Sequence, residues 1–167
     1  MVQVSENIVI DLTKCLANVG EKVPFGGDFV LGGDLLSYPD ATLEKVSVSF
    51  DVTFLNPDVL VEGTVQCFLK GKCDRCQENV EKSVTLPFRQ IFCKDFAPED
   101  GYAYTASRLD ATKAVQDEIV LGLPTLFLCD DNCKGLCPEC GADLNKGDCG
   151  CAKNKENVFS VLKNLKF

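Results

Sequence analysis

Cysteine is the residue type with the clearest chemistry in this chain. The 167 residues include 11 cysteines and no histidine, and six of the cysteines lie within residues 129–151, CDDNCKGLCPECGADLNKGDCGC. Two more, Cys73 and Cys76, form a C-x2-C pair upstream. Zinc prefers four sulfur or nitrogen ligands, and a C-x2-C pair holds the ion from one tight turn. The sequence therefore predicts two four-cysteine sites for Zn2+.

Two partitions of these eight cysteines satisfy tetrahedral coordination. In the first, one site contains Cys137, Cys140, Cys149 and Cys151, and the other contains Cys73, Cys76, Cys129 and Cys133. In the second, the two C-x2-C turns pair with each other, as in an ordinary zinc ribbon. We favour the first partition because its local set closes one site unaided and no ligand is left over.

Other chemistry is possible for the same cysteines. An iron–sulfur cluster uses four thiolates equally well, although two knuckle-like turns favour zinc. A redox C-x2-C needs a helix N-terminus to lower its pKa, and Cys73 is flanked by strand patterns instead. A catalytic zinc keeps an open position, whereas each set here closes with four thiolates. These comparisons predict metal binding without enzymatic activity. The three remaining cysteines, Cys15, Cys67 and Cys93, are predicted to be packing residues, because a free cysteine behaves as a small apolar side chain.

Charge and composition restrict the partners. A net charge of −8 excludes a protein that coats nucleic acid through bulk electrostatics. Residues 152–167 are locally basic, and we expect nucleic-acid or partner contacts at Lys72, Arg75, Lys153, Lys155, Lys163 and Lys166. The first residues lack a signal-peptide pattern, and no apolar run reaches membrane length. The sequence therefore predicts a soluble protein of a reducing compartment without membrane contact.

Alternating apolar residues predict the strands that position the cysteines. Three runs, 46–54, 59–69 and 80–88, have period-two patterning and predict an antiparallel meander with Cys73 and Cys76 at one tip. The two GGD units at 26–28 and 32–34 predict tight turns, and 94–104 reads as an exposed loop. Residues 126–128 read as a short apolar strand that leads into the cysteine block.

Helical patterns predict a helix near 110–121 and a basic, amphipathic helix in the C-terminal segment. We divide the chain into a β-rich body at 1–128, a cysteine-rich segment at 129–151 packed on that body, and the basic helix at 152–167. The expected fold class is α+β, with an antiparallel, barrel-like sheet and one or two packed helices.

The order of motifs is specific. It runs from C-x-R-C at 73–76 through DEIVLGLP at 117–124 to CKGLCPECGADLN at 133–145, followed by C-x-C and a C-terminal VFSVLKNL. This order resembles the YceD-like family of large-subunit ribosomal RNA accumulation proteins, from about Val46 to Leu165. The first forty residues match only loosely.

The resemblance implies a bacterial cytoplasmic (or plant organellar) factor, not an enzyme, that supports ribosomal RNA accumulation and ribosome assembly. The partner would be a pre-ribosomal particle, through its RNA or protein, with no small-molecule substrate. Some relatives lack the GLCP block but keep C-x-R-C and the later cysteine pair, which favours two separable sites. The alternative function is a thiol-based redox or metal-sensing regulator.

Overall fold

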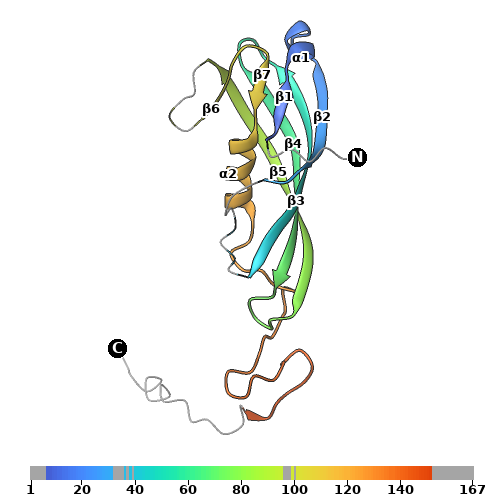
Figure 1. The fold of residues 1–167 in the computed structure, drawn as a ribbon, viewed down its shortest axis with the longest axis vertical. Coiled ribbons are helices and arrows are strands. Elements are labelled where there is room, and N and C mark those ends of the chain that lie inside the picture. The colour runs from blue at the N-terminus through green and yellow to red at the C-terminus, as the bar shows by residue number, and fades with distance from the viewer. Residues whose placement is uncertain are drawn as a thin grey trace, which may run out of the picture.

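The computed structural model describes residues 7–31, 36, 38, 40–95, 99 and 101–151. Its largest element is a five-stranded sheet of order β2-β3-β4-β5-β6, antiparallel except between β5 and β6. The strands are β2 (Lys22–Phe29), β3 (Ala41–Phe54), β4 (Val59–Lys72), β5 (Asn79–Lys94) and β6 (Tyr102–Tyr104). The long β3, β4 and β5 make the body elongated, and the cysteine-rich segment lies at one end (Figure 1).

The predicted meander is confirmed in β3, β4 and β5. Alternate residues of β3, namely Val46, Val48, Phe50 and Val52, are each at most 4% exposed. The Phe50 ring stacks on Phe88 of β5 with centroids 4.7 Å apart. Each such buried side chain contributes about 1.5–3 kcal/mol relative to exposure. The alternation therefore gives the sheet one apolar face, and the β4–β5 tip carries the CDRC turn.

A second layer covers this face. β1 (Val9–Asp11) and β7 (Arg108–Asp110) form a two-stranded antiparallel sheet, and α1 (Thr13–Ala17) and α2 (Thr112–Gly122) are the helices. The helix expected near 110–121 is therefore confirmed. Its buried residues Ala114, Val115 and Ile119 recur at helical spacing and join the main core. No helix of the described residues is long and apolar enough to cross a membrane.

Three local expectations were wrong. The first GGD unit lies inside β2, where Gly26 and Gly27 pair with β3 and so extend the ladder. Tyr102–Tyr104 is a strand because it pairs in parallel with the end of β5. Residues 126–128 are not a strand, although Phe127 bonds to the CDRC turn. Pairing with β3 and with β5 decided the first two cases, and local composition does not report such pairing.

The sheet is open, with β2 and β6 as its two edges, so the described strands do not form the expected barrel-like closure. Two helices beside mostly antiparallel sheets fit the α+β class. Of the three packing cysteines, Cys15 and Cys67 lie in the main core as expected, and burial raises the pKa of the Cys67 thiol to about 11. Cys93 is half-buried.

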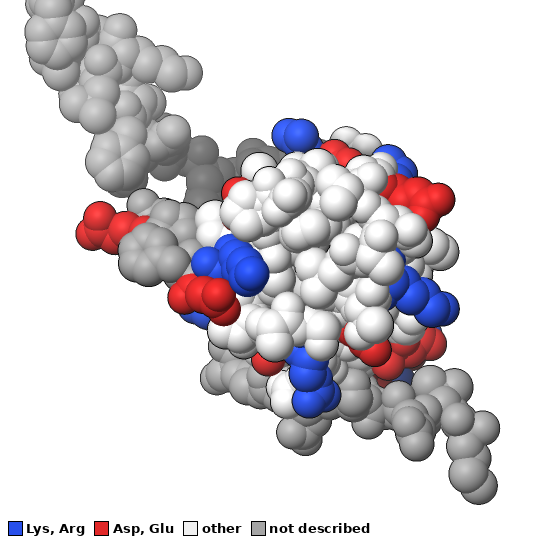
Figure 2. Space-filling model, turned by 90° about the horizontal axis from the view of Figure 1, so that it is seen from above, with Lys and Arg blue, Asp and Glu red and all other residues white. Residues whose placement is uncertain are grey.

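The second GGD unit and the whole basic segment 152–167 lie outside the described residues. The end of the body remote from the cysteines presents a largely uncharged surface with charged residues around its edge (Figure 2). Two exposed apolar side chains, Val19 at 63% and Leu55 at 48%, follow α1 and β3 respectively.

Candidate metal centres

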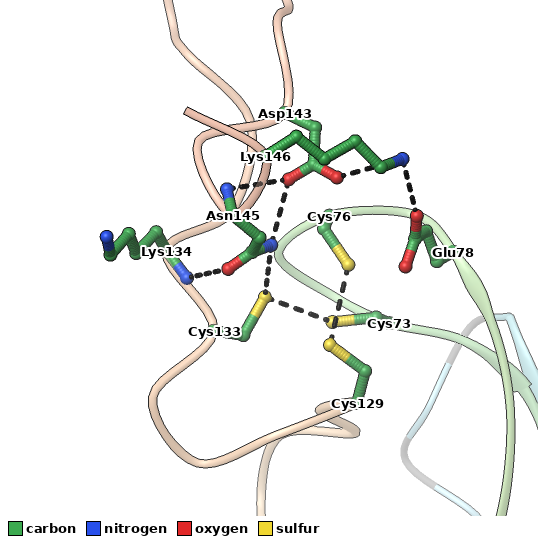
Figure 3. A network of polar contacts seen from close by, with 9 residues as sticks. All are labelled: Cys73, Cys76, Glu78, Cys129, Cys133, Lys134, Asp143, Asn145 and Lys146. Carbon is green, nitrogen blue, oxygen red and sulfur yellow. Dashed lines mark hydrogen bonds and ion pairs between the residues drawn. The ribbon is translucent and has the colours of Figure 1, made fainter. Parts of the chain in front are cut away.

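The first cluster brings together Cys73, Cys76, Cys129 and Cys133, with all four Sγ atoms within 4.8 Å of one another. The Cys73–Cys133 sulfurs are 3.9 Å apart and the Cys76–Cys129 sulfurs 3.6 Å (Figure 3). Zinc–sulfur bonds of about 2.3 Å in a tetrahedron place the sulfurs about 3.8 Å apart. A disulfide needs a separation of about 2.05 Å. The four thiols therefore have the spacing of ligands that share one ion.

The two residues inside the CDRC turn bring in the other half of this cluster. The Asp74 N–H donates to the Phe127 carbonyl at 2.8 Å, and the Phe127 N–H donates to the Asp74 carboxylate at 2.6 Å. Arg75 Nη1 donates to the Cys133 carbonyl at 2.8 Å. Because Phe127 precedes Cys129 by two residues, these bonds deliver both cysteines of the second pair to the turn.

The chain between the clusters also runs against the CDRC turn. The Leu136 N–H donates to the Arg75 carbonyl at 3.1 Å. Gly135 has a φ of +74°, and a Cβ there would lie 3.0 Å from the same carbonyl oxygen. Glycine suits both the left-handed backbone and the close approach. The turn therefore anchors the segment that leads to the second cluster.

The second cluster brings together Cys137, Cys140, Cys149 and Cys151, again with sulfurs within 4.8 Å of one another. This is the partition that local spacing favoured. The cluster is formed by one loop, and none of residues 138–151 is buried. In the first cluster Cys73, Cys76 and Cys133 are each at most 4% exposed. The two sets thus have the same thiol donors but differ in how far the surrounding fold buries them.

Both C-x2-C turns have the same backbone geometry. The N–H four residues after the first cysteine donates back to its carbonyl at 2.9 Å, from Gln77 to Cys73 and from Gly141 to Cys137. Those donors have positive φ values, 61° at Gln77 and 73° at Gly141. This bend directs free amides at the sulfur, and the Arg75 N–H lies 3.4 Å from Cys73 Sγ. Such amide donors orient and stabilise thiolate ligands.

The thiols of each cluster ionise unequally. Burial raises the pKa of Cys73, but the backbone amides of Cys76, Cys129 and Arg75 outweigh it, and the pKa falls to about 6. The amides of Cys140 and Glu139 lower the pKa of Cys137 to about 7. The first cysteine of each knuckle is therefore the first to become a thiolate.

The last thiols of each cluster resist ionisation. Hydrogen bonding with Cys133 raises the pKa of Cys129 to about 12, and hydrogen bonding with Cys140 does the same for Cys151. Adjacent thiolates would repel one another without a cation between them. A bound cation of charge +2 would remove this penalty, so the donor set fits a divalent metal ion.

The expected contact residues are only partly placed. Lys72 ends β4 beside the CDRC turn, and its N–H donates to the Asp40 carbonyl at 3.0 Å. Arg75 lies against the cysteine segment through its bond to Cys133. The lysines 153, 155, 163 and 166 lie outside the described residues.

Comparison with known proteins identifies the family. The family model described as "Large ribosomal RNA subunit accumulation protein YceD" matches residues 61–166, the segment that holds all eight clustered cysteines. The chain belongs to the YceD family. No solved structure showed significant similarity to it.

Two curated relatives that carry the family's name come from plants, and another relative is mycobacterial. Large ribosomal RNA subunit accumulation protein YCED homolog 1, chloroplastic, from Arabidopsis thaliana is 25% identical over 80% of this chain and 51% of that protein. The Zea mays protein of the same name is 26% identical over 80% of this chain and 58% of its own length. An uncharacterized Mycobacterium leprae protein is 28% identical over 59% of this chain and 49% of its own length. The chain thus spans about half the length of these relatives.

Sequence reasoning missed the polar residues that support the cysteines of this YceD protein. The sequence patterns gave no role to Asp74 and placed Asn145 only within a motif, yet Asp74 accepts the Phe127 N–H and Asn145 donates to the Cys133 sulfur. Lys146 forms ion pairs with Asp143 of its own loop and with Glu78, and the second pair connects the loop to the start of β5 (Figure 3). The one sequence feature that could have indicated Asp74 is its position between two cysteine ligands.

Proposed function

We propose that this chain is a zinc-binding, non-enzymatic factor that supports large-subunit ribosomal RNA accumulation and ribosome assembly. The observation that carries the proposal is the pair of closed four-cysteine clusters within the segment that matches the YceD family. The plant relatives are named for large ribosomal RNA subunit accumulation. The eight cysteines would hold two zinc ions, in a bacterial cytoplasm that keeps thiols reduced.

The donor chemistry supports a structural role for the metal. Four thiolates complete a tetrahedral shell, so no position is left for a water or a substrate. The chain also has no histidine that could act as a general base. We therefore propose that zinc stabilises a surface for binding pre-ribosomal particles, without a small-molecule substrate.

The proposed contact surface lies at the cysteine end of the body. Lys70 and Lys146 are paired with carboxylates there, whereas Lys72 has no ion pair within the described part of the chain. We propose that Lys72, Arg75 and the four lysines of 152–167 contact ribosomal RNA or a ribosomal protein. An exposed lysine without a local carboxylate keeps its charge available to a phosphate.

Affinity capture tests this function. Tagged wild-type protein at low salt should recover large-subunit ribosomal RNA or ribosomal proteins, and Lys72→Ala should reduce the yield. Lys14→Ala is the matched control because Lys14 lies in α1, at the end of the body remote from the cysteines (Figure 1). RNase treatment before capture separates direct RNA contact from contact through protein. Recovery of neither RNA nor ribosomal protein by the wild type would sink the proposal.

A redox or metal-sensing regulator is the second candidate, because Cys137, a buried thiol of lowered pKa, shares its cluster with the exposed Cys140. Low-pKa, accessible cysteines are the ones that oxidise. This candidate predicts rapid thiol modification of the zinc-loaded protein at neutral pH. Two zinc ions that resist peroxide, with no fast-reacting thiol, would exclude it. A colourless protein prepared without oxygen would exclude an iron–sulfur cluster.

A further inference from the structure

One side chain of the second loop reaches the first cluster. Asn145 follows the second C-x2-C turn, and its Nδ2 donates to Cys133 Sγ at 3.4 Å (Figure 3). Its Oδ1 accepts the N–H of Lys134 at 2.8 Å. The Lys134 N–H can only donate, so it must face the amide oxygen and leave the NH2 group facing the sulfur. The orientation of Asn145 is therefore set by its surroundings.

Asn145 is held in place by the loop that forms the second cluster. Asp143 Oδ1 accepts both the main-chain and the side-chain N–H of Asn145 at 2.9 Å. The Leu144 N–H donates to the Gly135 carbonyl at 2.9 Å. Leu136 and Asp143 pair through their main chains as an isolated antiparallel β-bridge. None of residues 138–151 is buried. The loop thus has no apolar core of its own to hold Asn145 against Cys133.

We propose that Asn145 is a positioning residue of the first centre, supplied by the loop of the second, so that metal in the second centre retains metal in the first. The inference rests on the proposed metal binding. A hydrogen bond to a ligand sulfur orients it and tunes its affinity for the ion, and loss of such a partner commonly costs about 10–100-fold in affinity. Metal in the second centre closes the loop that presents this donor.

The proposal makes the two centres energetically coupled. Coupling between two binding equilibria is reciprocal, so metal in the first centre also strengthens binding at the second. The ion pair from Lys146 to Glu78 adds a second connection between the loop and the body. The Lys146–Glu78 pair is exposed and weak, so Asn145, which reaches a ligand sulfur directly, carries most of the coupling.

The rate of zinc release to an excess of a colorimetric chelator tests the role of Asn145. The wild type should release zinc in two phases, with the slow phase from the buried first centre. Asn145→Ala should accelerate the slow phase about tenfold or more. Asn132→Ala, the same substitution in the exposed segment between Cys129 and Cys133, should match the wild type.

Two more variants separate positioning from loop folding. Asn145→Asp keeps an acceptor for the Lys134 N–H but loses the donor to sulfur, so it should also accelerate release. With cobalt in place of zinc, both Asn145 variants should shift the sulfur-to-metal charge-transfer band. If Asn145→Asp behaved as the wild type in both measurements, the sulfur contact would have no role.

Cys140→Ser tests the coupling itself. Emptying the second centre should leave a single zinc that departs faster than the wild-type slow phase, and adding Asn145→Ala should accelerate it by less than in the wild type. A slow phase unaffected by Cys140→Ser, or multiplicative effects of the two changes, would overturn the inference. If the protein bound no zinc, the wild type would release none. This result would contradict the proposed function and differs from every outcome that concerns the coupling alone.

Discussion

The two cysteine clusters use one backbone motif in two different settings. The first is built where the β4–β5 tip meets residues 127–133, and three of its four cysteines are buried. The second is formed by a single loop in which residues 138–151 are all at least partly exposed. Both begin with a C-x2-C turn that has the same main-chain hydrogen bond and left-handed residue. The ligand motif is therefore independent of the scaffold that surrounds it.

This difference in setting assigns different roles to the two centres. Metal in the first would connect the sheet to a distant segment and so contribute to the stability of the whole body. Metal in the second would organise its own loop, and it would reach the body mainly through Asn145. Four predictions test this contrast, in order of decreasing effect.

The largest effect is expected from removing one ligand of each centre. With zinc in excess, Cys76→Ser should lower the free energy of unfolding of the body by an amount on the order of several kcal/mol, because metal binding there is folding energy. Cys140→Ser should cost the body less, about 1–3 kcal/mol, because it removes only the tenfold to hundredfold gain in first-centre affinity that Asn145 transmits. Thermal unfolding followed by circular dichroism measures both. Equal destabilisation by the two variants would remove the distinction between the centres.

A carboxylate that supports each centre gives the next contrast. Asp74→Ala should destabilise the body by about 1–3 kcal/mol because it leaves the buried Phe127 N–H without an acceptor. Asp74→Asn retains an acceptor and should recover most of this loss. In the second loop Asp148 accepts the Gly150 N–H at 2.9 Å in an exposed position, so Asp148→Ala should have little effect on the body. Urea titration of the three variants provides the comparison.

The left-handed residue after each knuckle distinguishes them further. Gly141→Ala should weaken zinc binding at the second centre by about 1–2 kcal/mol, the cost of a left-handed L-residue. A Cβ there would meet nothing within 4 Å, so the cost is conformational. Gly141→Asn is the control, since asparagine tolerates this backbone better. Competition with a chelator of known affinity measures the loss, and unchanged binding by Gly141→Ala would argue against this geometry in solution.

The smallest contrast is in pH dependence. The first cysteine of each C-x2-C turn has a pKa below the ordinary value of 9.0. The pKa of Cys73 is about 6 and that of Cys137 is about 7. Protons compete with the metal for each thiolate, and at equal metal affinity a thiolate of higher pKa loses that competition at a higher pH. The second centre should therefore lose cobalt absorbance at a higher pH than the first. Loss in the opposite order would contradict this assignment.

The sequence predicted the parts of the molecule that repeat a local pattern. The period-two alternation of Val46 to Val52 gave β3, and the spacing of Val115 and Ile119 gave α2. The grouping of the eight cysteines followed from spacing and count. The strand, the helix and the second cluster each depend on residues within one short segment, and the first cluster followed because four paired cysteines were left over.

The remainder depends on contacts between distant residues. Gly26 and Gly27 resemble a turn in isolation, but pairing with β3 makes them strand. The Asp74–Phe127 and Asn145–Cys133 hydrogen bonds join segments whose approach no local pattern encodes. The open edge of the sheet also depends on where β6 pairs, which is set by three residues beside the end of β5.

Native mass spectrometry of the zinc-loaded protein tests the central claim most directly. Two separate four-cysteine centres predict two zinc ions in the wild type and one in each of the Cys76→Ser and Cys140→Ser variants. A wild-type protein with one zinc or none, or a single substitution that removes both ions at saturating zinc, would contradict the account.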